Sequence, residues 1–371
     1  MRAAFAGGGS AGHLSPSVAI AQRFLRLAPD SPEVFFFGAQ RDLDRRILAP
    51  YPHRLLSAAG LPYGLSPKTV TALVRLAWAG GEALSSLRRF RANVLVGTGG
   101  YVTAAAAPAA ALRHLPCVLH SSDALPDRTT VRLARMAHTI TVAFEAAAEH
   151  FPADKVVVTG QPVREEFLSG DRESARAELG YAPDDFVFVV TGGSQGAQRL
   201  NQAVLGAAGK LLAAGVKIRH QTGALSFEAV QEAAAEQKLG PDYHCFAFHN
   251  ELWRLLAAAD LVLIRAGASS LAEAAAWSLP MVVVPGAFAH GHQRHNAQEL
   301  TRRGAAVMIE DAALTPEALA ETVLALQGDA TRRAAMSAAA AGWGSRGAAE
   351  RIAELAIAAA QACQSGGQRL K

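Results

Sequence analysis

The sequence contains little cysteine, little lysine and little net charge. Its three cysteines, Cys117, Cys245 and Cys363, stand far apart, and no CxxC or Cys/His cluster accompanies them. Neither a structural zinc site nor a disulfide framework is therefore expected, and a reducing compartment suits the chain best. The net charge is only +4, from 36 basic and 32 acidic residues. A nucleic-acid-binding protein concentrates far more positive charge, so we expect no nucleic-acid partner.

Long apolar runs are also missing. A membrane-spanning helix needs roughly 18–20 consecutive apolar residues. The Ala-rich stretch Val102–Leu112 is shorter than this and is broken by Pro108. The sequence opens directly on an apolar run and a glycine loop, without the pattern of a signal peptide. We therefore expect a cytoplasmic protein that meets a membrane only at its surface.

The sequence does contain enough apolar material for two domains. Of its 371 residues, 50% are hydrophobic and 18% are charged, and a single core rarely organises a chain of this length. Short apolar runs alternate with amphipathic segments, which is typical of α/β proteins with parallel sheets. Strands are expected at Ala3–Ala6, Val34–Phe37, Val94–Val96, Cys117–Leu119, Ile140–Val142, Val156–Val158, Phe186–Val190, Val216–Arg219, His244–Phe246, Leu261–Ile264 and Met281–Val284.

This pattern restarts near the middle of the chain. The strand Phe186–Val190 is followed at once by a second glycine loop, Gly192–Gly196. We therefore predict two Rossmann-like, doubly wound parallel-sheet domains that face a cleft. The first covers residues 1–163 and the second covers residues 164–345. Residues 346–371 are expected to form an Ala-rich helix, which packs back towards the first domain, and a frayed tail.

The first glycine loop runs from Gly7 to His13, between the first strand and a helix. Glycine lets a backbone turn tightly and approach a ligand, and the helix N-terminus presents free N–H groups to an anion. The spacing matches the GxGxxG fingerprint of dinucleotide-binding proteins, although the acidic residue expected after the second strand is absent. Arg41 stands there and is able to meet a 2′-phosphate, so an NADP-dependent oxidoreductase remains an alternative, as does a turn without ligand. His13 favours chemistry, because a dinucleotide loop has no need of a histidine.

The second glycine loop occupies the same place in the second half of the chain. Ser194, in its middle, can donate its hydroxyl to a phosphate, as can the backbone N–H groups of the following helix. One such loop is common. Two at matching positions favour a ligand held between domains, which a single dinucleotide-binding domain does not require.

A third segment follows the strand Leu261–Ile264. Arg265 is well placed to counter the charge of a diphosphate, and Glu273 is expected about two turns into the next helix. A carboxylate at that position can accept hydrogen bonds from both hydroxyls of a ribose. The alternative is a Glu273 side chain that only faces solvent.

The loop after the strand Met281–Val284 carries His290, with His292 and His295 close behind. Three histidines invite a metal-binding interpretation, but no nearby carboxylate or cysteine completes a ligand set. We expect no resident metal and no other cofactor. Gln293 and Asn296 are better interpreted as neutral groups that hydrogen-bond to sugar hydroxyls.

These segments occur in the order found in one bacterial enzyme family. Each is unspecific alone, but the ordered set spans almost the whole chain and resembles the MurG family of GT-B glycosyltransferases. The matching segments are Gly7–His13, Gly97–Val102, Gly160–Arg164, Gly192–Ala197 with Asn201, Ala268–Glu273, His292-Gln293 and Asn296-Ala297. The resemblance implies a role in peptidoglycan synthesis. The implied donor co-substrate is UDP-N-acetylglucosamine, and the implied acceptor is undecaprenyl-diphosphoryl-muramoyl-pentapeptide (lipid I).

The resemblance also implies roles for single residues. Arg164 and Ser194 would hold the diphosphate, and Glu273 the ribose. Gln293, with the neighbouring His292, would contact the sugar. The full donor-side set is Arg164, Gly193, Ser194, Phe248 (bordering the uracil pocket), Arg265, Ala268, Glu273, His292 and Gln293. The acceptor-side set is Ser10, Gly12, His13, Tyr101, His120 and Asp123, and the supporting residues are Asn201 and Asn296.

Inverting transfer to a sugar hydroxyl needs a general base for the proton and positive charge for the departing UDP. His13 is the expected base, because histidine titrates near neutral pH. Helix N-termini and arginines can stabilise the departing UDP, so no divalent metal need be built in.

The sequence departs from the family after the strand Cys117–Leu119. The family usually has His-Glu-Gln-Asn there, whereas this chain has His120-Ser121-Ser122-Asp123, and Asp127 stands where a glycine is usual. The lost side chains belong to the acceptor side, so another lipid or metabolite is an alternative acceptor. Asp123 is a second candidate for the base.

The segment Val70–Arg91 bears on the acceptor as well. It combines apolar residues such as Leu73 and Trp78 with arginines such as Arg75 and Arg88. Such a helix is compatible with an anionic membrane surface, where a lipid acceptor would be presented. The alternative is an ordinary amphipathic helix packed on the sheet. With the family, we expect peripheral attachment to the inner face of the cell membrane.

Overall fold

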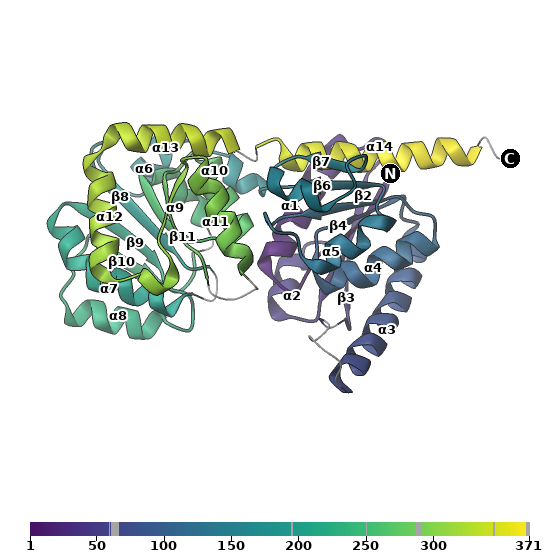
Figure 1. Cartoon of the computed structure of the whole chain (residues 1–371), viewed down its shortest axis with the longest axis horizontal. Helices are drawn as coiled ribbons and strands as arrows, with labels where there is room; N and C mark the ends of the chain where they lie inside the picture. The colour runs from purple at the N-terminus through teal and green to yellow at the C-terminus, as the bar shows by residue number, and fades with distance from the viewer. Residues whose placement is uncertain are drawn as a thin grey trace. The chain divides into compact units, whose positions relative to one another are not determined.

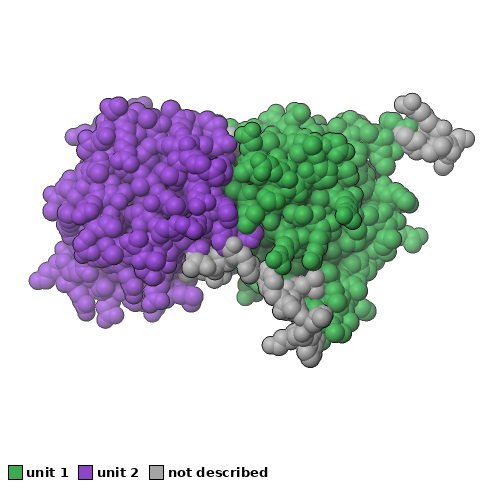
Figure 2. All heavy atoms as spheres, viewed as in Figure 1, with its two compact units in different colours: residues 1–165, 345–371 green, residues 166–344 purple. Residues whose placement is uncertain are grey.

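The computed structural model describes residues 1–58, 60, 67–193, 196–249, 251–286, 291–343 and 346–368. The chain divides into two compact units, which Figure 2 shows in different colours. Unit 1 consists of Met1–Glu165 and Ser345–Lys371, and unit 2 consists of Glu166–Gly344. Each unit contains a parallel sheet with helices packed on it (Figure 1), so the predicted α/β fold with two Rossmann-like domains is confirmed.

The sheet of unit 1 is built from short buried strands. They are β1 (Arg2–Ala6), β2 (Glu33–Ala39), β3 (His53–Leu56), β4 (Val94–Gly97), β5 (Cys117–Ser121), β6 (Thr139–Val142) and β7 (Val156–Val158). Within the described residues their spatial order is β3-β2-β1-β4-β5-β6-β7, and every pair is parallel. The central strands β1 and β4 are buried on both faces, which explains their continuous apolar sequences. The edge strand β3 was not among the predicted strands.

Helices cover both faces of this sheet. They are α1 (Ala11–Leu27), α2 (Asp42–Leu48), α3 (Pro67–Phe90), α4 (Gly100–Leu112), α5 (Arg128–Leu133) and α14 (Ala348–Gln368), with 3-10 helices η1 (Ala134–Met136) and η2 (Glu145–His150). α3 and α4 bury residues such as Ala83 and Ala106 in the core on one face. On the other face α1 packs against α14, whose buried Ile352, Ala356 and Ala359 recur at helical spacing. The C-terminal helix therefore belongs to unit 1.

The sheet of unit 2 repeats this plan. Its strands are β8 (Phe186–Thr191), β9 (Val216–Gln221), β10 (Tyr243–Phe246), β11 (Leu261–Arg265), β12 (Met281–Val284) and β13 (Ala306–Met308). Their order is β10-β9-β8-β11-β12-β13 in the part of unit 2 that the structure describes. The edge strand β13 was also not predicted.

The helices of unit 2 complete its core. They are α6 (Arg172–Glu178), α7 (Gln198–Ala213), α8 (Phe227–Glu236), α9 (Leu252–Ala258), α10 (Ala268–Ala276), α11 (His292–Arg302), α12 (Pro316–Gly328) and α13 (Ala330–Trp343), with 3-10 helices η3 (Glu165–Leu168) and η5 (Asp311–Ala313). α7 and α12 pack together on the sheet through residues such as Val204 and Val323. No helix among the described residues is both long enough and apolar enough to cross a membrane.

Each sheet has one point where the strand order reverses, between β1 and β4 in unit 1 and between β8 and β11 in unit 2. Ligands of open α/β sheets bind at such switch points, outside the carboxyl ends of the strands, because neighbouring loops leave there in opposite directions. The loop Gly7–Ser10 follows β1, and the loop Gly192–Ala197 follows β8. Both glycine loops therefore lie at switch points.

Candidate active site

The first glycine loop is closed against the loop that follows β4. A Cβ atom at Gly7 would lie 2.1 Å from Thr98 Oγ1, and a Cβ atom at Gly9 would lie 2.7 Å from Tyr101 Oη. Gly9 also has φ of +85°, which glycine adopts without strain. Only glycine fits at these two positions. The loop then enters α1 through the exposed Ser10 and Gly12.

Two residues after β2 fix this loop from the other side. Asp44 is fully buried, and its Oδ2 accepts hydrogen bonds from the backbone N–H groups of Gly9 (3.0 Å) and Ala39 (2.7 Å). Arg41 Nη1 donates to the Gly9 carbonyl oxygen at 2.8 Å. Sequence reasoning missed Asp44, although an acidic residue in a first helical turn was a usable signal. The sequence suggested Arg41 only as a ligand for a 2′-phosphate, whereas in the structure its guanidinium bonds to the backbone of the first glycine loop.

His13 lies in the first turn of α1, with its ring next to Gly99 and Gly100. Its Nδ1 lies 3.1 Å from the carbonyl oxygen of Thr98. A carbonyl oxygen only accepts, so Nδ1 carries the hydrogen and Nε2 keeps its lone pair in the neutral ring. The Thr98 hydroxyl donates to the His13 carbonyl oxygen at 2.6 Å, and Ser17 Oγ lies 2.7 Å from the same hydroxyl. The orientation is that of a base whose second nitrogen is held by the protein.

The segment after β5 divides into buried and half-buried groups. His120 has no exposed surface, and its ring bonds to Thr141 Oγ1 (3.0 Å) and Gln161 Oε1 (2.9 Å). Burial lowers the pKa of His120 to about 4, against the opposing effect of the Gln161 bond, so the ring is neutral at pH 7. Both hydrogen-bond partners of the His120 ring, Thr141 and Gln161, belong to unit 1. Asp123 is half-buried in the loop beyond it.

Asp127, which replaces the family's glycine, caps α5. Its Oδ1 accepts hydrogen bonds from the backbone N–H groups of Thr129 (2.8 Å) and Thr130 (3.0 Å). A capping carboxylate satisfies N–H groups that the helix leaves unpaired and opposes its dipole favourably. The structure thus gives Asp127 a local role at the end of the loop between β5 and α5.

The second glycine loop is bounded by two glycines with positive φ, +85° at Gly193 and +78° at Gly196. The Gly193 N–H donates to Thr191 Oγ1 at 3.2 Å. A Cβ atom at Gly196 would lie 2.0 Å from the carbonyl oxygen of Thr222, so the loop backbone rests against the end of β9. Ser194, the predicted phosphate ligand between them, lies outside the described residues.

The end of β9 carries a group of residues that sequence reasoning missed. His220, Gln221 and Thr222 are consecutive polar residues, and each is at most 2% exposed. Asn201 Nδ2 donates to the Thr222 carbonyl oxygen at 2.9 Å, and Gln221 Nε2 donates to Thr191 Oγ1 at 3.2 Å. Both bonds support the second glycine loop. Three polar residues that directly continue a buried strand were the available signal.

The end of β11 and the helix α11 carry several of the predicted site residues. Arg265 Nη1 pairs with Asp311 Oδ1 at 2.5 Å. Asn296 is fully buried and donates to the Ala266 carbonyl oxygen at 3.0 Å. Gln293 Oε1 accepts from the Gly286 N–H at 2.8 Å, so its Nε2 is the atom suited to donate to a ligand. His290 lies outside the described residues.

Two helices begin after the strands β11 and β12. Ala268 is the first residue of α10, and the half-buried Glu273 lies further along the same helix. His292 is the first residue of α11. Within the described residues, the N-cap residues of α7, α10 and α11 make no side-chain hydrogen bond to their helices, and their first turns contain no acidic residue. The positive ends of these helix dipoles are therefore suited to an anion.

Phe248 and Arg164 complete the predicted donor set. Phe248 follows β10 and is 57% exposed. The N–H of its neighbour His249 donates to Gln221 Oε1 at 3.3 Å, and Gln221 in turn contacts Thr191 beside Gly193. Phe248 is thereby linked to the second glycine loop. Arg164 belongs to unit 1, whereas the other predicted donor residues belong to unit 2.

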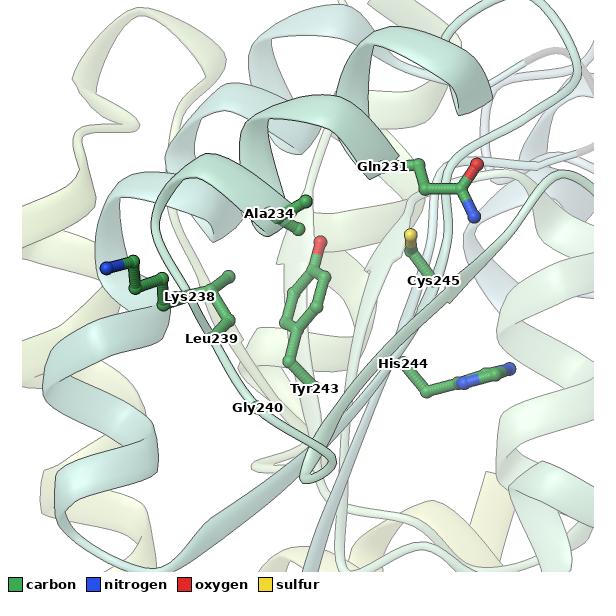
Figure 3. A pocket seen from close by; sticks show the side chains of 9 residues that line it. Gln231, Ala234, Lys238, Leu239, Gly240, Tyr243, His244 and Cys245 are labelled. Carbon is green, nitrogen blue, oxygen red and sulfur yellow. The ribbon is translucent and has the colours of Figure 1, made fainter.

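Two hollows in the described part of the surface lie away from the predicted site residues. One of about 270 Å³ lies between α8 and β10, where Figure 3 shows Tyr243 between Ala234 and His244. Another, of about 540 Å³, lies in unit 1 beside Cys117 and Cys363. Neither contains a predicted site residue. Loop geometry and helix termini, rather than surface concavity, therefore identify the candidate site.

Comparison with known proteins supplies a family. Residues 3–142 match the glycosyltransferase family 28 N-terminal domain, and residues 187–352 match the glycosyltransferase family 28 C-terminal domain. Among solved structures, the chain is similar to MurG of Acinetobacter baumannii, with a TM-score of 0.75 and 25% sequence identity over 96% of this chain and 98% of that chain.

Two curated relatives carry the same name, UDP-N-acetylglucosamine–N-acetylmuramyl-(pentapeptide) pyrophosphoryl-undecaprenol N-acetylglucosamine transferase. The chain is 41% identical to that of Desulforudis audaxviator over 91% of this chain and 92% of the relative. It is 38% identical to that of Moorella thermoacetica over 96% of this chain and 98% of the relative. The resemblance found in the sequence is confirmed: the chain belongs to this family of glycosyltransferases.

Proposed function

We propose that the chain transfers N-acetylglucosamine, with inversion, from UDP-N-acetylglucosamine to the muramoyl-pentapeptide carried on undecaprenyl diphosphate, which converts lipid I to lipid II. The observation that carries the proposal is the 41% identity to a transferase of that name over 91% of the chain. The two glycine loops at switch points support it, because a transferase must hold two substrates.

On the donor side, we assign the diphosphate to the N-termini of α7 and α10. The helix dipole is positive at these ends, and the first turns of both helices lack acidic residues that would repel an anion. Glu273 would accept the ribose hydroxyls, and Gln293 would donate its Nε2 to the sugar. Phe248 would border the uracil, since its ring is exposed and the N–H of the next residue, His249, bonds to Gln221, which in turn bonds to Thr191 at the start of the second glycine loop. Arg164 and Ser194 remain proposed diphosphate ligands.

On the acceptor side, we assign the general base to His13. Its Nε2 lone pair takes the proton of the acceptor hydroxyl while that oxygen forms a bond to the anomeric carbon. The bond from this carbon to UDP breaks, and UDP leaves with the electron pair. The N–H groups of α7 and α10 stabilise the charge that develops on UDP, so the proposal includes no metal ion.

A second candidate function is transfer of the same sugar to a different acceptor. The segment His120–Asp123 lacks three side chains of the family's acceptor side, and Asp127 caps α5 where a glycine is usual. These changes leave the proposed donor residues untouched. The two candidates therefore share a donor and differ only in the hydroxyl that attacks.

We also propose that α3 attaches the enzyme to an anionic membrane. Ala72, Ala79 and Ala83 of this helix are buried, and the helix packs mainly against α4. A second apolar surface faces outwards, namely Val70 (62% exposed), Leu73 (51%), Val74 (64%) and Trp78 (70%). The exposed arginines on and beside this helix are Arg75, Arg88, Arg89 and Arg91. An apolar face beside cations suits the boundary between acyl chains and anionic headgroups, and the inner face of the cell membrane is where the lipid acceptor would lie.

The donor is tested by isothermal titration calorimetry with UDP-N-acetylglucosamine, UDP and NADPH in turn. We expect one site that binds both uridine nucleotides, and no binding of NADPH. Binding of NADPH alone would contradict the proposal and restore the oxidoreductase. Binding of the UDP-sugar without turnover on a lipid I analogue would favour the second candidate.

A further inference from the structure

A continuous chain of hydrogen bonds runs through the interior of unit 2. The Tyr243 hydroxyl lies 2.8 Å from His220 Nδ1, and His220 Nε2 lies 3.0 Å from Asn201 Oδ1. Asn201 Nδ2 then lies 2.9 Å from the carbonyl oxygen of Thr222. His220 and Thr222 have no exposed surface, Asn201 is 2% exposed and Tyr243 is 7% exposed. Water therefore does not compete for these bonds, and each group depends on the next.

The Thr222 carbonyl oxygen, at the end of this series of hydrogen bonds, fixes the direction of every bond in it. A backbone carbonyl only accepts, so Asn201 presents Nδ2 to Thr222 and Oδ1 to His220. Oδ1 only accepts, so His220 Nε2 carries a hydrogen. Burial lowers the pKa of His220 to about 3, so the ring is neutral at pH 7 and Nδ1 is an acceptor. The Tyr243 hydroxyl is the donor that completes this tautomer.

The chain of hydrogen bonds ends at the second glycine loop. A Cβ atom at Gly196 would lie 2.0 Å from the Thr222 carbonyl oxygen, so the loop rests directly on the atom that Asn201 holds. The Gly196 N–H donates to the Gly193 carbonyl oxygen at 3.0 Å, which joins the two ends of the turn. A shift of the Thr222 carbonyl would therefore move both glycines of the loop.

We propose that Tyr243 and His220 are positioning residues for the donor. Through Asn201 they hold the Thr222 carbonyl, and thereby keep Gly193 and Gly196 in place for the diphosphate of a nucleotide sugar. The inference rests on the proposed function, because it requires a diphosphate at this loop. Tyr243 is the first residue of β10 and lines the hollow shown in Figure 3, so it acts through His220 rather than by contact with the donor.

Tyr243→Phe removes the donor hydroxyl and keeps the ring. His220 Nδ1 is then buried without its partner, and the other tautomer, with the hydrogen on Nδ1, becomes accessible. That tautomer requires Asn201 to turn its amide and to set Oδ1 against the Thr222 carbonyl oxygen, where two acceptors repel. We expect UDP to bind about threefold to tenfold more weakly, the usual effect of one lost hydrogen bond. The KM for UDP-N-acetylglucosamine should rise by the same factor, and the KM for the lipid acceptor should not change.

Tyr181→Phe is the matched control. Tyr181 is 8% exposed in the same unit, and its ring lies under the guanidinium groups of Arg176 and Arg219, outside the hydrogen-bond chain. We expect wild-type affinity for UDP in this variant. Equal losses of affinity in both variants would mean general destabilisation and would overturn the specific role of Tyr243.

The outcomes separate this inference from the function on which it rests. Wild-type UDP affinity in Tyr243→Phe would overturn the positioning role and leave the transferase intact. Failure of the wild-type enzyme to bind UDP would overturn the proposed function itself. Nitrogen chemical shifts of His220 in the unliganded wild-type protein give a further test that does not depend on a variant. We expect a protonated Nε2 and an unprotonated Nδ1, and the reverse would contradict the proposed hydrogen-bond directions.

Discussion

The ring of His13 is anchored at one nitrogen, and this decides what the other nitrogen can do. Nδ1 lies 3.1 Å from the Thr98 carbonyl oxygen, and the Thr98 hydroxyl lies 2.6 Å from the His13 carbonyl oxygen. Thr98 therefore fixes both the ring and the backbone of the proposed base. The proposed function of this arrangement is proton transfer, which can be separated experimentally from the proposed donor binding in unit 2.

We predict that His13→Gln lowers kcat by about 10²- to 10⁴-fold, the usual contribution of a general base, and leaves the Kd for UDP unchanged. Steady-state kinetics and calorimetry check the two parts. Asp123→Asn is the companion variant, because Asp123 is the other candidate base. A large loss of kcat in Asp123→Asn together with a mild effect in His13→Gln would transfer the role to Asp123.

Glu273 tests the donor side at the same scale. Its half-buried carboxylate on α10 is proposed to accept the ribose hydroxyls. We predict that Glu273→Ala weakens UDP binding by roughly 1–3 kcal/mol, the range for an uncompensated hydrogen-bond partner. Calorimetry of UDP binding measures this, with the exposed Glu236 of α8 changed to alanine as a control. Unchanged affinity in Glu273→Ala would remove this residue from the site.

At the scale of elements, the second glycine loop owes its shape to a backbone conformation and a close contact together. Gly196 has φ of +78° and rests on the Thr222 carbonyl. Gly215, between α7 and β9, has φ of +80°, and a Cβ atom there would meet nothing within 4 Å. The two glycines share the strain of a left-handed conformation but differ in the contact.

We predict that Gly215→Ala costs about 1–2 kcal/mol of unfolding free energy, the strain of a left-handed residue. Gly196→Ala should cost more, because its Cβ must displace backbone, and it alone should weaken UDP binding. Denaturant unfolding and calorimetry compare the variants. Equal losses of stability with equal UDP affinities would contradict the contact as the reason for glycine at this position.

The exposed face of α3 gives the next prediction. Leu73→Glu should reduce binding to vesicles that contain anionic lipid by about tenfold or more, since burial of one leucine contributes about 1.5–3 kcal/mol. Leu225→Glu is the control, because Leu225 is 88% exposed and belongs to unit 2, whereas α3 belongs to unit 1. Vesicle sedimentation measures both. Equal effects of the two substitutions would show that α3 is not the attachment surface.

Elements differ in how far the sequence predicts them. The strand Phe186–Thr191 and its glycine loop were found, because a doubly buried strand is continuously apolar and a tight turn needs glycine. The edge strands β3 and β13 were missed, because β3 begins with the polar residues His53 and Arg54 and β13 has only one β-branched residue. The edge strand β7 is equally short but was found, because it consists of 3 valines. Strands such as β3 and β13 are defined by the neighbour with which they pair rather than by their own pattern.

The residues of the candidate site were likewise only partly predictable from the sequence. The glycines, His13 and Glu273 could be picked out from local patterns and from their order along the chain. The contact of His220 with Tyr243 could not, because it joins residues 23 positions apart through the register of β9 and β10. The clamp of Asp44 on Gly9 likewise spans 35 positions. Contacts of this kind follow from sheet topology, which a single sequence specifies only indirectly.

For the whole molecule, two buried histidines make stability depend on pH. Burial lowers the pKa of His120 to about 4 and that of His220 to about 3, whereas an unfolded chain has histidines near about 6.5. Between these values the unfolded state binds protons that the folded state does not. Stability is therefore highest above about pH 7 and falls as the pH drops, by about 1.4 kcal/mol per pH unit for each histidine.

We predict that His220→Gln removes about one proton from this pH dependence. The free energy of unfolding of the variant, measured by denaturant between about pH 6 and pH 4.5, should fall less steeply with pH than that of the wild type. The comparison of slopes is independent of the stability that the substitution itself removes. If unfolding free energy fell equally steeply with pH in both proteins, the claim that His220 is buried and neutral would be contradicted.

The central claim is tested most directly by turnover. The protein is incubated with UDP-N-acetylglucosamine and a short-chain lipid I analogue, and the products are identified by mass spectrometry and by the anomeric coupling in the proton spectrum. We predict release of one UDP for each disaccharide-linked lipid, with the new bond in the β configuration, because direct displacement inverts the donor's α configuration. Retention of the α configuration, or no transfer from a donor that binds, would contradict the account.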